Sequence, residues 1–279
     1  MALPGCGPQT NPKPAALQAG RLPFGVSDRI CATGLDDAAR RNQDNLHNMP
    51  VLTRSRVETG WAYYAPLIAH EIGTACGPAT PAFAVRLAAW QFVHKLGRTG
   101  VMDPPTIAAM KTGWDLRRPF VVASRLGCPA PPPEASLATV PAEDSYGGMT
   151  LKLRPAALAA YNRMLAAARA ESPQIASDRR LLTLFSAWRR PDAETARCVA
   201  EANCQGVARA TCSAHLTGLA VDLDLGAAPG DRLDSSDDAN RLYISQGAAY
   251  RWLVANAARF GFVPYAFEPW HWEWTGEPI

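Results

Sequence analysis

The sequence lacks long apolar runs and carries little charge, and both absences narrow the classes of protein to which it can belong. No apolar segment approaches the roughly 20 residues of a membrane-spanning helix, so we expect no membrane span. Charged residues make up 19% of the chain and the formal net charge is +3, which gives no strong field for a nucleic-acid partner. The composition is that of a globular protein, and 279 residues are enough for two domains.

The sequence has seven cysteines, and no two of them have C-x-x-C spacing. This argues against a structural zinc cluster. Cys198 and Cys204 are close enough in sequence for a local disulfide, and Cys31 with Cys76 is a candidate for a longer one. Because the number of cysteines is odd, at least one of them has no partner within the chain.

Histidine is also scarce. The five histidines are His47, His70, His94, His215 and His271. We interpret His70 and His94 as helix residues and His47 as a loop residue. His70 is followed by Glu, as at the start of a zincin helix, but position 74 is Thr, so the second histidine of H-E-x-x-H is missing. Only His215 and His271 lie among carboxylates and turn residues, which makes them the candidate metal ligands.

The first candidate lies in the run Ser213-Ala-His215-Leu-Thr-Gly218-Leu-Ala-Val-Asp222. Apolar and small or acidic residues alternate over 219–225, which predicts a strand. Gly218 precedes the strand and suits a tight turn, which can fold His215 back toward Asp222. The alternative is an ordinary buried strand with a polar entry loop.

The second candidate lies in Glu268-Pro-Trp-His271-Trp, near the C-terminus. Residues three apart point to opposite faces of a flat strand, but Pro269 predicts an edge strand or an irregular segment. A kink there can turn His271 onto a metal and leave Glu268 over its open position. Trp270 and the tryptophans that alternate after it can exclude water from the site, although they are also typical core residues.

Two imidazoles and one carboxylate, with a fourth position open, form the ligand set of a catalytic zinc ion. A glutamate outside that set can act as the base toward a zinc-activated water molecule. We therefore interpret the chain as a metallohydrolase with one Zn²⁺.

A third motif, Phe185-Ser-Ala-Trp188-Arg189-Arg190-Pro, follows a predicted buried strand at 181–186. A guanidinium group can bind a carboxylate or stabilise an oxyanion, whereas the alternative is that both arginines are solvated.

The order Ser-x-aromatic-Arg, Ser-x-His-x-x-Gly-x-x-x-Asp and Glu-x-x-His resembles the zinc D-alanyl-D-alanine carboxypeptidases of the vancomycin-resistance (VanY) type. The resemblance covers about residues 145–279. The wider group with this metal site includes dipeptidases, L,D-carboxypeptidases, phage endolysins and the hedgehog signalling domain. The resemblance therefore implies a hedgehog/D-Ala-D-Ala-peptidase-like fold for this part of the chain.

The resemblance also implies roles for individual residues. The implied zinc ligands are His215, Asp222 and His271. Glu268 is implied as the general base and later acid, and Arg189 as the catalytic arginine. The implied substrate-binding residues are Ser213, Arg190 and Trp270. Which of the two arginines points inward stays open, and we favour Arg189. Ala214 stands where the carboxypeptidase branch usually has Glu, so the detailed substrate is also open.

The function that this resemblance implies is hydrolysis of the terminal D-Ala-D-Ala bond of peptidoglycan stem peptides. An L,D-carboxypeptidase or a peptidoglycan endopeptidase with the same zinc site is the alternative enzyme. A non-catalytic zinc-containing protein that binds the cell wall is the alternative from another class, and the presence of both Glu268 and Arg189 argues against it.

A cell-wall substrate requires export, so we expect the protein in the periplasm or outside the cell, where the cysteines can form disulfides. We also expect it to be a monomer. The N-terminus lacks the apolar core of a secretory signal, and we expect a signal peptide that is not present in this sequence.

The first half of the chain is organised differently. Residues 1–30 are rich in Pro, Gly and Ala and are expected to form a flexible leader. Residues 31–127 are predicted to be helical, with one helix over 81–96 and another that Asp103 caps. The motifs Trp90-Gln, Thr99-Gly-Val-x-Asp and Thr106-x-x-Ala-Met resemble a peptidoglycan-binding three-helix module. The alternative is a small helical domain with a structural role. Residues 128–144 are a predicted proline-rich linker.

In residues 145–279 we expect a helix from Pro155, the strand at 181–186 and a helix from about Asp192. The ligand strand at 219–225 follows, then a helix capped by Ser245 and closed by Gly261, and a strand pair near 262–275. Helices and short strands in this mixed order predict an α+β fold.

Overall fold

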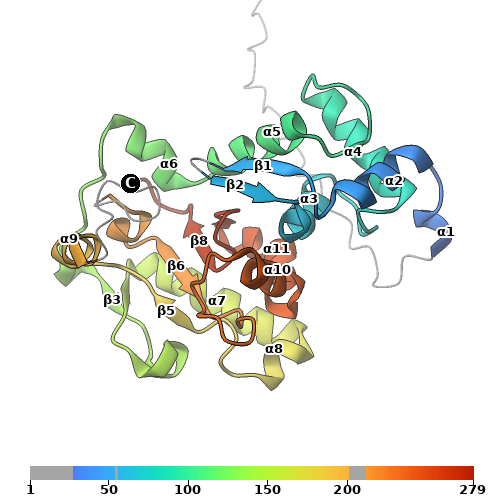
Figure 1. Ribbon diagram of the computed structural model, residues 1–279. Helices are drawn as coiled ribbons and strands as arrows, with labels where there is room; N and C mark the ends of the chain where they lie inside the picture. The colour runs from blue at the N-terminus through green and yellow to red at the C-terminus, as the bar shows by residue number, and fades with distance from the viewer. Residues whose placement is uncertain (1–27, 54–55, 201–211) are drawn as a thin grey trace, which may run out of the picture.

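The structure, a computed structural model, describes residues 28–53, 56–200 and 212–279. Most of the predicted leader and Cys204 therefore lie outside the described residues. Helices combine with small antiparallel sheets, so the fold is α+β as the sequence predicts (Figure 1). In the described part of the chain, no helix is both long enough and apolar enough to cross a bilayer.

The first part of the described chain contains short helices around a β-hairpin. Its helices are α1 (Asp28–Cys31), α2 (Asp36–Asn45), α3 (Ala65–Glu71), α4 (Pro81–Val93), α5 (Pro104–Asp115) and α6 (Pro119–Ala123), with 3-10 turns η1 (Ala62–Tyr64) and η2 (Ser124–Leu126). The hairpin, β1 (Pro50–Thr53) and β2 (Arg56–Thr59), was not predicted. Its strands are too short for a clear alternating pattern, and Val51 alone places a large apolar side chain from β1 in the core.

Helices α4 and α5 form where the sequence predicts helices, and the Asp103 cap is confirmed, but α4 ends at Val93 rather than at residue 96. Thr80 precedes α4, and its hydroxyl accepts a hydrogen bond from the Phe83 amide. Asp103 precedes α5, and its carboxylate accepts one from the Thr106 amide at 2.9 Å. These caps satisfy amide groups that have no partner within the helix. The buried side chain of Gln91 donates to the Val101 carbonyl at 2.9 Å, which holds the connection between the helices.

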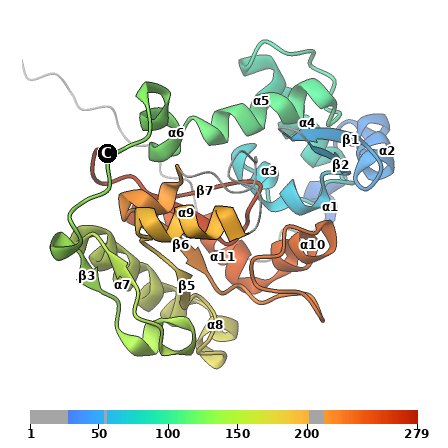
Figure 2. The same cartoon turned by 60° about the vertical axis from the view of Figure 1, so that its left-hand side comes forward.

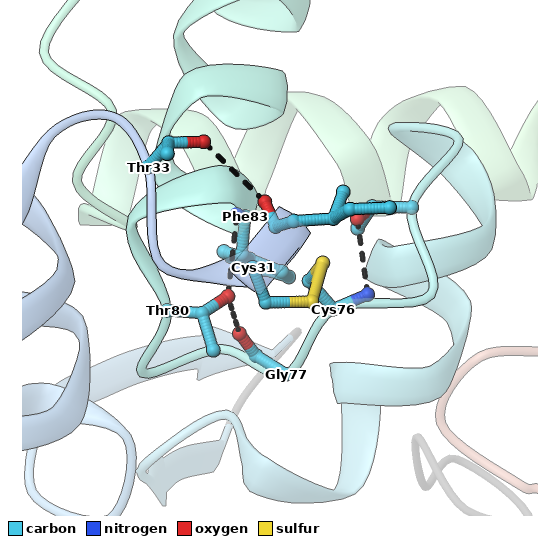
Figure 3. The surroundings of a disulfide bond; sticks show 8 residues. Cys31, Thr33, Cys76, Gly77, Thr80 and Phe83 are labelled. Carbon is cyan, nitrogen blue, oxygen red and sulfur yellow. Dashed lines mark hydrogen bonds between the residues drawn. A yellow bond between two sulfur atoms is a disulfide. The ribbon is translucent and has the colours of Figure 1, made fainter. Parts of the chain in front are cut away.

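Two disulfides join residues that are distant in sequence. The predicted Cys31–Cys76 bond is confirmed, and it links α1 to the segment before α4 (Figure 3). A second bond, Cys128–Cys212, spans 84 residues and was not predicted. Cys198 is disulfide-bonded too. Its predicted partner, Cys204, lies outside the described residues, so that pairing stays a prediction.

Residues 128–153 contain short elements. These are η3 (Glu134–Ser136), β3 (Ala138–Thr139), η4 (Ala142–Asp144), η5 (Tyr146–Gly148) and β4 (Lys152–Leu153). Strands β3 and β4 pair antiparallel. Within this segment Val140 and Leu153 are buried.

The remaining helices and turns surround a four-stranded sheet. They are α7 (Pro155–Glu171), α8 (Pro173–Ser177), α9 (Pro191–Ala200), η6 (Ala214–Thr217), α10 (Asp238–Gln246), α11 (Ala248–Asn256) and η7 (Ala257–Phe260). The strands are β5 (Leu184–Ser186), β6 (Ala220–Leu223), β7 (Phe262–Pro264) and β8 (His271–Trp274). Their order across the sheet is β5-β6-β8-β7, and each neighbouring pair is antiparallel.

Most of these elements match the expected ones, but the strands expected at 181–186 and 219–225 are shorter, and the predicted cap of one helix is wrong. Ser245 does not cap a helix: it lies inside α10, and its hydroxyl donates to the Leu242 carbonyl at 2.8 Å. Gly247 is the residue that precedes α11. Gly247 separates α11 from α10, a helix that was not predicted. Gly261 ends the last turn in a left-handed conformation, as predicted.

One hydrophobic cluster of buried side chains extends from Met49 to Trp274, so the early and late parts of the chain share a core. Turn η1 and helix α3 pack against α10 and α11. A buried ion pair between Glu58 on β2 and Arg241 on α10 lies at this contact. The two views show the hairpin and α3 on one side of the molecule and β5 with α7 on the other (Figures 1 and 2).

Candidate active site

The two central strands of the sheet bring the separate motifs together. Asp222 on β6 lies directly opposite His271 on β8 in the strand register. His215 lies in the 3-10 turn η6 just before β6. Ser213 accepts a hydrogen bond from the His215 amide, and Gly218 ends the turn with a φ of 71°. A side chain at position 218 would be strained there, so glycine allows the chain to return into β6.

His215, Asp222 and His271 form one compact, buried group. The Nε2 atom of His215 lies 3.1 Å from one carboxylate oxygen of Asp222. The Nδ1 atom of His271 lies 2.9 Å from the other oxygen. The candidate ligand atoms of the three residues all lie within 4.8 Å of one another. Neighbouring strands therefore bring together Asp222 and His271, which are 49 positions apart, and the tight turn adds His215.

The hydrogen bonds of His215 fit a cation in this group. Its Nδ1 lies 2.7 Å from the Ala187 carbonyl, which only accepts hydrogen bonds, so Nδ1 is the protonated nitrogen. In the neutral ring, Nε2 then directs a lone pair at the Asp222 carboxylate. Two electron-rich atoms 3.1 Å apart require a cation or a proton between them. Two imidazoles and one carboxylate form a ligand set that zinc accepts.

The charges of the three residues are set by burial and by one another. Burial and the nearby Arg189 guanidinium lower the pKa of His215, so the ring is neutral at physiological pH. Burial alone would raise the pKa of Asp222, but both imidazoles hold it well below its usual range. Burial also opposes a charged His271, yet Asp222 and Glu273 outweigh it and raise the pKa of His271 to about 9. A proton and a metal ion therefore compete for this imidazole.

Glu268 lies on the turn that leads into β8. Its amide donates to the Tyr265 carbonyl at 3.1 Å, and its carbonyl accepts from the His271 amide at 2.9 Å. These bonds make the kink that Pro269 predicts. Burial raises the pKa of the Glu268 carboxyl, although His271 opposes the shift. A carboxylate with a raised pKa is a stronger base than one in water.

The structure separates the two arginines that the sequence left open. Arg189 donates to Ser186 Oγ at 3.0 Å, and its Nη2 lies 3.1 Å from Asp222. Arg190 turns away and pairs with Asp192, with its Nη2 2.9 Å from that carboxylate, and both side chains are exposed. The structure therefore does not bring Arg190 to the group around Asp222.

A cavity of about 830 Å³ opens above the group. The candidate residues in its lining are Arg189, Ser213, His215, Asp222, Glu268, Trp270 and His271. Trp270 is buried and presents an apolar wall, while Trp272 and Trp274 are buried core residues, as the alternative interpretation expected. The volume is large enough for a small peptide segment.

Sequence reasoning missed several residues around the cavity. Glu273 on β8 is buried, and one of its oxygens lies 3.5 Å from His271 Nε2. Its spacing of two from His271 was an available signal, because such residues share a face of a strand. Arg118, which precedes α6, pairs with Glu273 at 2.7 Å and also lines the cavity. No local pattern marks Arg118. The loop at 231–236 also contributes to the lining.

Comparison with known proteins agrees with the geometry. Residues 150–277 match the family model of VanY, described as D-alanyl-D-alanine carboxypeptidase. The match includes the three motifs and the whole four-stranded sheet. No curated protein matches the chain. Residues 150–277 therefore belong to the VanY family of D-alanyl-D-alanine carboxypeptidases, and this part of the chain is a peptidase domain of that family.

Proposed function

We propose that this protein is a zinc-dependent D,D-carboxypeptidase that hydrolyses the terminal D-Ala-D-Ala bond of peptidoglycan stem peptides. The observation that carries the proposal is the buried group of His215, Asp222 and His271 at the floor of a cavity that Glu268 and Arg189 also line. These are the residue types that a metallopeptidase requires, and they lie within the part of the chain that matches the family.

Each group has a distinct role in the proposed reaction. His215, Asp222 and His271 would hold one zinc ion, which supplies an activated water molecule and a Lewis acid when bound. Glu268 accepts a proton from the attacking water and returns it to the amine of the departing D-alanine. Arg189 lies beside Asp222 and neutralises negative charge that develops on the scissile carbonyl oxygen. The net change is addition of water across one peptide bond.

The substrate is held by the cavity walls. Ser213 offers a hydroxyl beside His215, and Trp270 offers an apolar face. Arg190 does not line the cavity, because Asp192 holds its side chain at the surface. The same zinc site would serve an L,D-carboxypeptidase or an endopeptidase, so the identity of the bond is the part of the proposal that needs a direct assay.

The proposal also includes a division of the chain into two domains. We assign residues 145–279 to a hedgehog/D-Ala-D-Ala-peptidase-like domain and residues 31–127 to a helical, peptidoglycan-binding-like domain, joined by residues 128–144. A wall-binding domain would raise the local concentration of the peptidase at its polymer. Two disulfides suit a protein that works in the periplasm or outside the cell.

Digestion of purified muropeptides tests the activity. The protein loaded with zinc should release one D-alanine from a stem peptide ending in D-Ala-D-Ala, which mass spectrometry detects as the loss of a single residue. Release of a different fragment would support the alternative enzymes. An unchanged peptide in the presence of zinc would support a non-catalytic wall-binding protein.

Glu268→Gln provides the matched test of mechanism. The substitution removes the base but keeps the size of the side chain, so turnover should fall by roughly 10²–10⁴-fold. Zinc content, measured by atomic spectroscopy, should stay at one ion per chain. Loss of zinc together with activity would show that Glu268 is a ligand instead.

A further inference from the structure

The residues that support His271 come partly from the first half of the chain, outside the part that matches the peptidase family. Arg118 immediately precedes α6, where the chain turns after α5. Its amide donates to the Asp115 carbonyl at 3.1 Å, and its side chain also lies 3.3 Å from the Asp115 carboxylate. Helix α6 packs beside β8, so this corner brings Arg118 to the edge of the metal-binding strand.

Arg118 and Glu273 form an ion pair that is sealed from water. The Nε atom of Arg118 lies 2.7 Å from one oxygen of Glu273, and the exposed fractions of the two side chains are only 5% and 2%. The other oxygen accepts a hydrogen bond from the Phe120 amide at 3.0 Å. Separating the two side chains would leave a buried charge uncompensated, which is strongly destabilising. The pair therefore holds Glu273 in place.

Glu273 connects this pair to a proposed metal ligand. Its oxygen Oε1, which Arg118 holds, lies 3.5 Å from Nε2 of His271. That separation is longer than a hydrogen bond, and Nε2 has no hydrogen-bond partner among the described residues. The opposite nitrogen, Nδ1, faces Asp222. A carboxylate behind a metal-binding imidazole fixes the orientation of the ring and raises its basicity.

A second contact leads from Arg118 to the same ring. The guanidinium carbon lies 3.8 Å from the centre of the Tyr265 ring, a cation–π contact. Tyr265 in turn packs edge-to-face on His271, with ring centres 5.9 Å apart and an angle of 87°. Arg118 therefore contacts two side chains, Glu273 and Tyr265, that both lie next to the His271 imidazole.

We propose that Arg118 is a positioning residue for the metal site: by holding Glu273 and Tyr265, it orients His271 so that Nδ1 faces Asp222 and the metal. The proposal rests on the zinc function proposed above. It makes the first half of the chain part of the peptidase site, rather than only a module that binds the polymer.

Zinc affinity in the full-length protein tests this role without depending on turnover. In competition with a chromophoric chelator, Arg118→Gln should bind zinc about 10–100-fold more weakly than the unmodified protein. Arg118→Lys keeps a cation near Glu273 and should recover part of the loss. Glu273→Gln should weaken zinc binding to a similar degree, because it removes the acceptor charge behind His271.

Arg117→Gln is the matched control. Arg117 is the neighbouring arginine, but it pairs with Glu71 at 2.8 Å and is half exposed. Its removal should leave zinc affinity and the cobalt absorption spectrum unchanged, whereas the spectrum of Arg118→Gln should shift because the ligand geometry changes. If Arg118→Gln does not fold, Glu273→Gln decides the question by the same two measurements.

The outcomes separate the two proposals. Failure of the unmodified protein to bind zinc would overturn the proposed function and the positioning role with it. Zinc bound by the unmodified protein, and equally tightly by a folded Arg118→Gln or Glu273→Gln variant, would overturn the positioning role alone. A raised KM with unchanged zinc affinity would also overturn it and would show that Arg118 contacts substrate directly.

Discussion

At the scale of single residues, Asp222 connects the charged groups of the site. Its two oxygens contact different imidazoles, and Arg189 approaches one of the same oxygens at 3.1 Å. The side chain is almost fully buried, so these contacts replace its hydration. The orientation of Arg189 toward the cavity therefore depends on the same carboxylate that the proposed zinc ion requires.

Replacement of Arg189 by Lys tests the role of the guanidinium group. Lysine keeps the charge but cannot bind Ser186 and Asp222 through a planar fork. We expect kcat on a D-Ala-D-Ala peptide to fall by about 10²–10³-fold, as when an oxyanion donor is lost. Steady-state kinetics of Arg190→Lys provides the comparison, and a larger loss there would reverse the assignment of the two arginines.

At the scale of elements, the turn η6 and the Cys128–Cys212 disulfide hold one edge of the cavity. Cys212 directly precedes Ser213, whose hydroxyl caps η6, and both residues line the cavity. The disulfide ties this point to the proline-rich segment near residue 128. The bond therefore constrains the chain just before His215, the first proposed ligand.

Removal of that disulfide should affect stability and activity together. In a Cys128→Ser/Cys212→Ser variant, we expect the free energy of unfolding to fall by about 2–5 kcal/mol, because a long loop is no longer closed in the unfolded chain. We also expect kcat/KM to fall by about tenfold or more, since a small displacement of a catalytic group is costly. Urea denaturation and peptide kinetics measure the two effects.

The Cys31–Cys76 pair serves as the control for this experiment. It closes a loop of 45 residues, and neither cysteine lines the cavity. Its removal should lower stability by a similar amount with little change in kcat/KM. Equal losses of activity in both variants would mean that the disulfide at Cys212 has no local role in the site.

The cap of α5 gives a second prediction at this scale. Asp103→Ala removes the hydrogen bond from the carboxylate to the Thr106 amide, so the free energy of unfolding should fall by about 0.5–2 kcal/mol. Asp103→Asn retains a side-chain oxygen and should restore most of the stability. Thermal or urea unfolding measures both variants, and equal stability of Ala and Asn would contradict the capping role.

At the scale of the whole molecule, a buried polar cluster joins the two parts of the chain. Glu58 is fully buried and contacts Arg241, Lys111 and Tyr64. Arg241 also lies over the Phe267 ring, with 4.5 Å to its centre, and Phe267 is adjacent to Glu268. Burial alone would raise the pKa of Glu58, but Arg241 and its other partners hold the pKa below the usual 4.5.

The lowered pKa of Glu58 predicts a pH dependence of stability. A carboxyl group that is more acidic in the folded state stabilises the fold above its unfolded pKa of 4.5 and loses that contribution as the pH falls through the folded value. Glu58→Gln should lower the free energy of unfolding by about 3–5 kcal/mol at neutral pH, because it leaves buried cations unpaired. The variant should also lose less stability than the unmodified protein when the pH falls to about 4.

Urea denaturation of both proteins at the two pH values measures this effect. The control is Glu134→Gln, since Glu134 forms a surface pair with Lys152. That change should leave stability nearly unchanged at both pH values, because solvent screens a surface pair. A Glu58 variant with the same pH dependence as the unmodified protein would contradict the prediction.

The sequence by itself determined which residues are candidates for the chemistry, and it determined much of the local structure. His215, Asp222, Glu268 and His271 stand in patterns whose residue types and spacings indicate a zinc hydrolase. Caps such as Asp103 and the end of the last helical turn were also predictable, because they depend on residues only a few positions apart. The roles of the site residues stay predictions until zinc and turnover are measured.

Tertiary structure alone decided which distant groups meet. The choice between Arg189 and Arg190 depends on where a side chain finds its partner, and Arg118 approaches His271 only because α6 packs against β8. The hairpin β1–β2 likewise gains its stability from core contacts rather than from a strong local pattern. Local propensity acts over a few residues, whereas ion pairs such as Arg118–Glu273 form between residues 155 positions apart and exist only once the chain has packed.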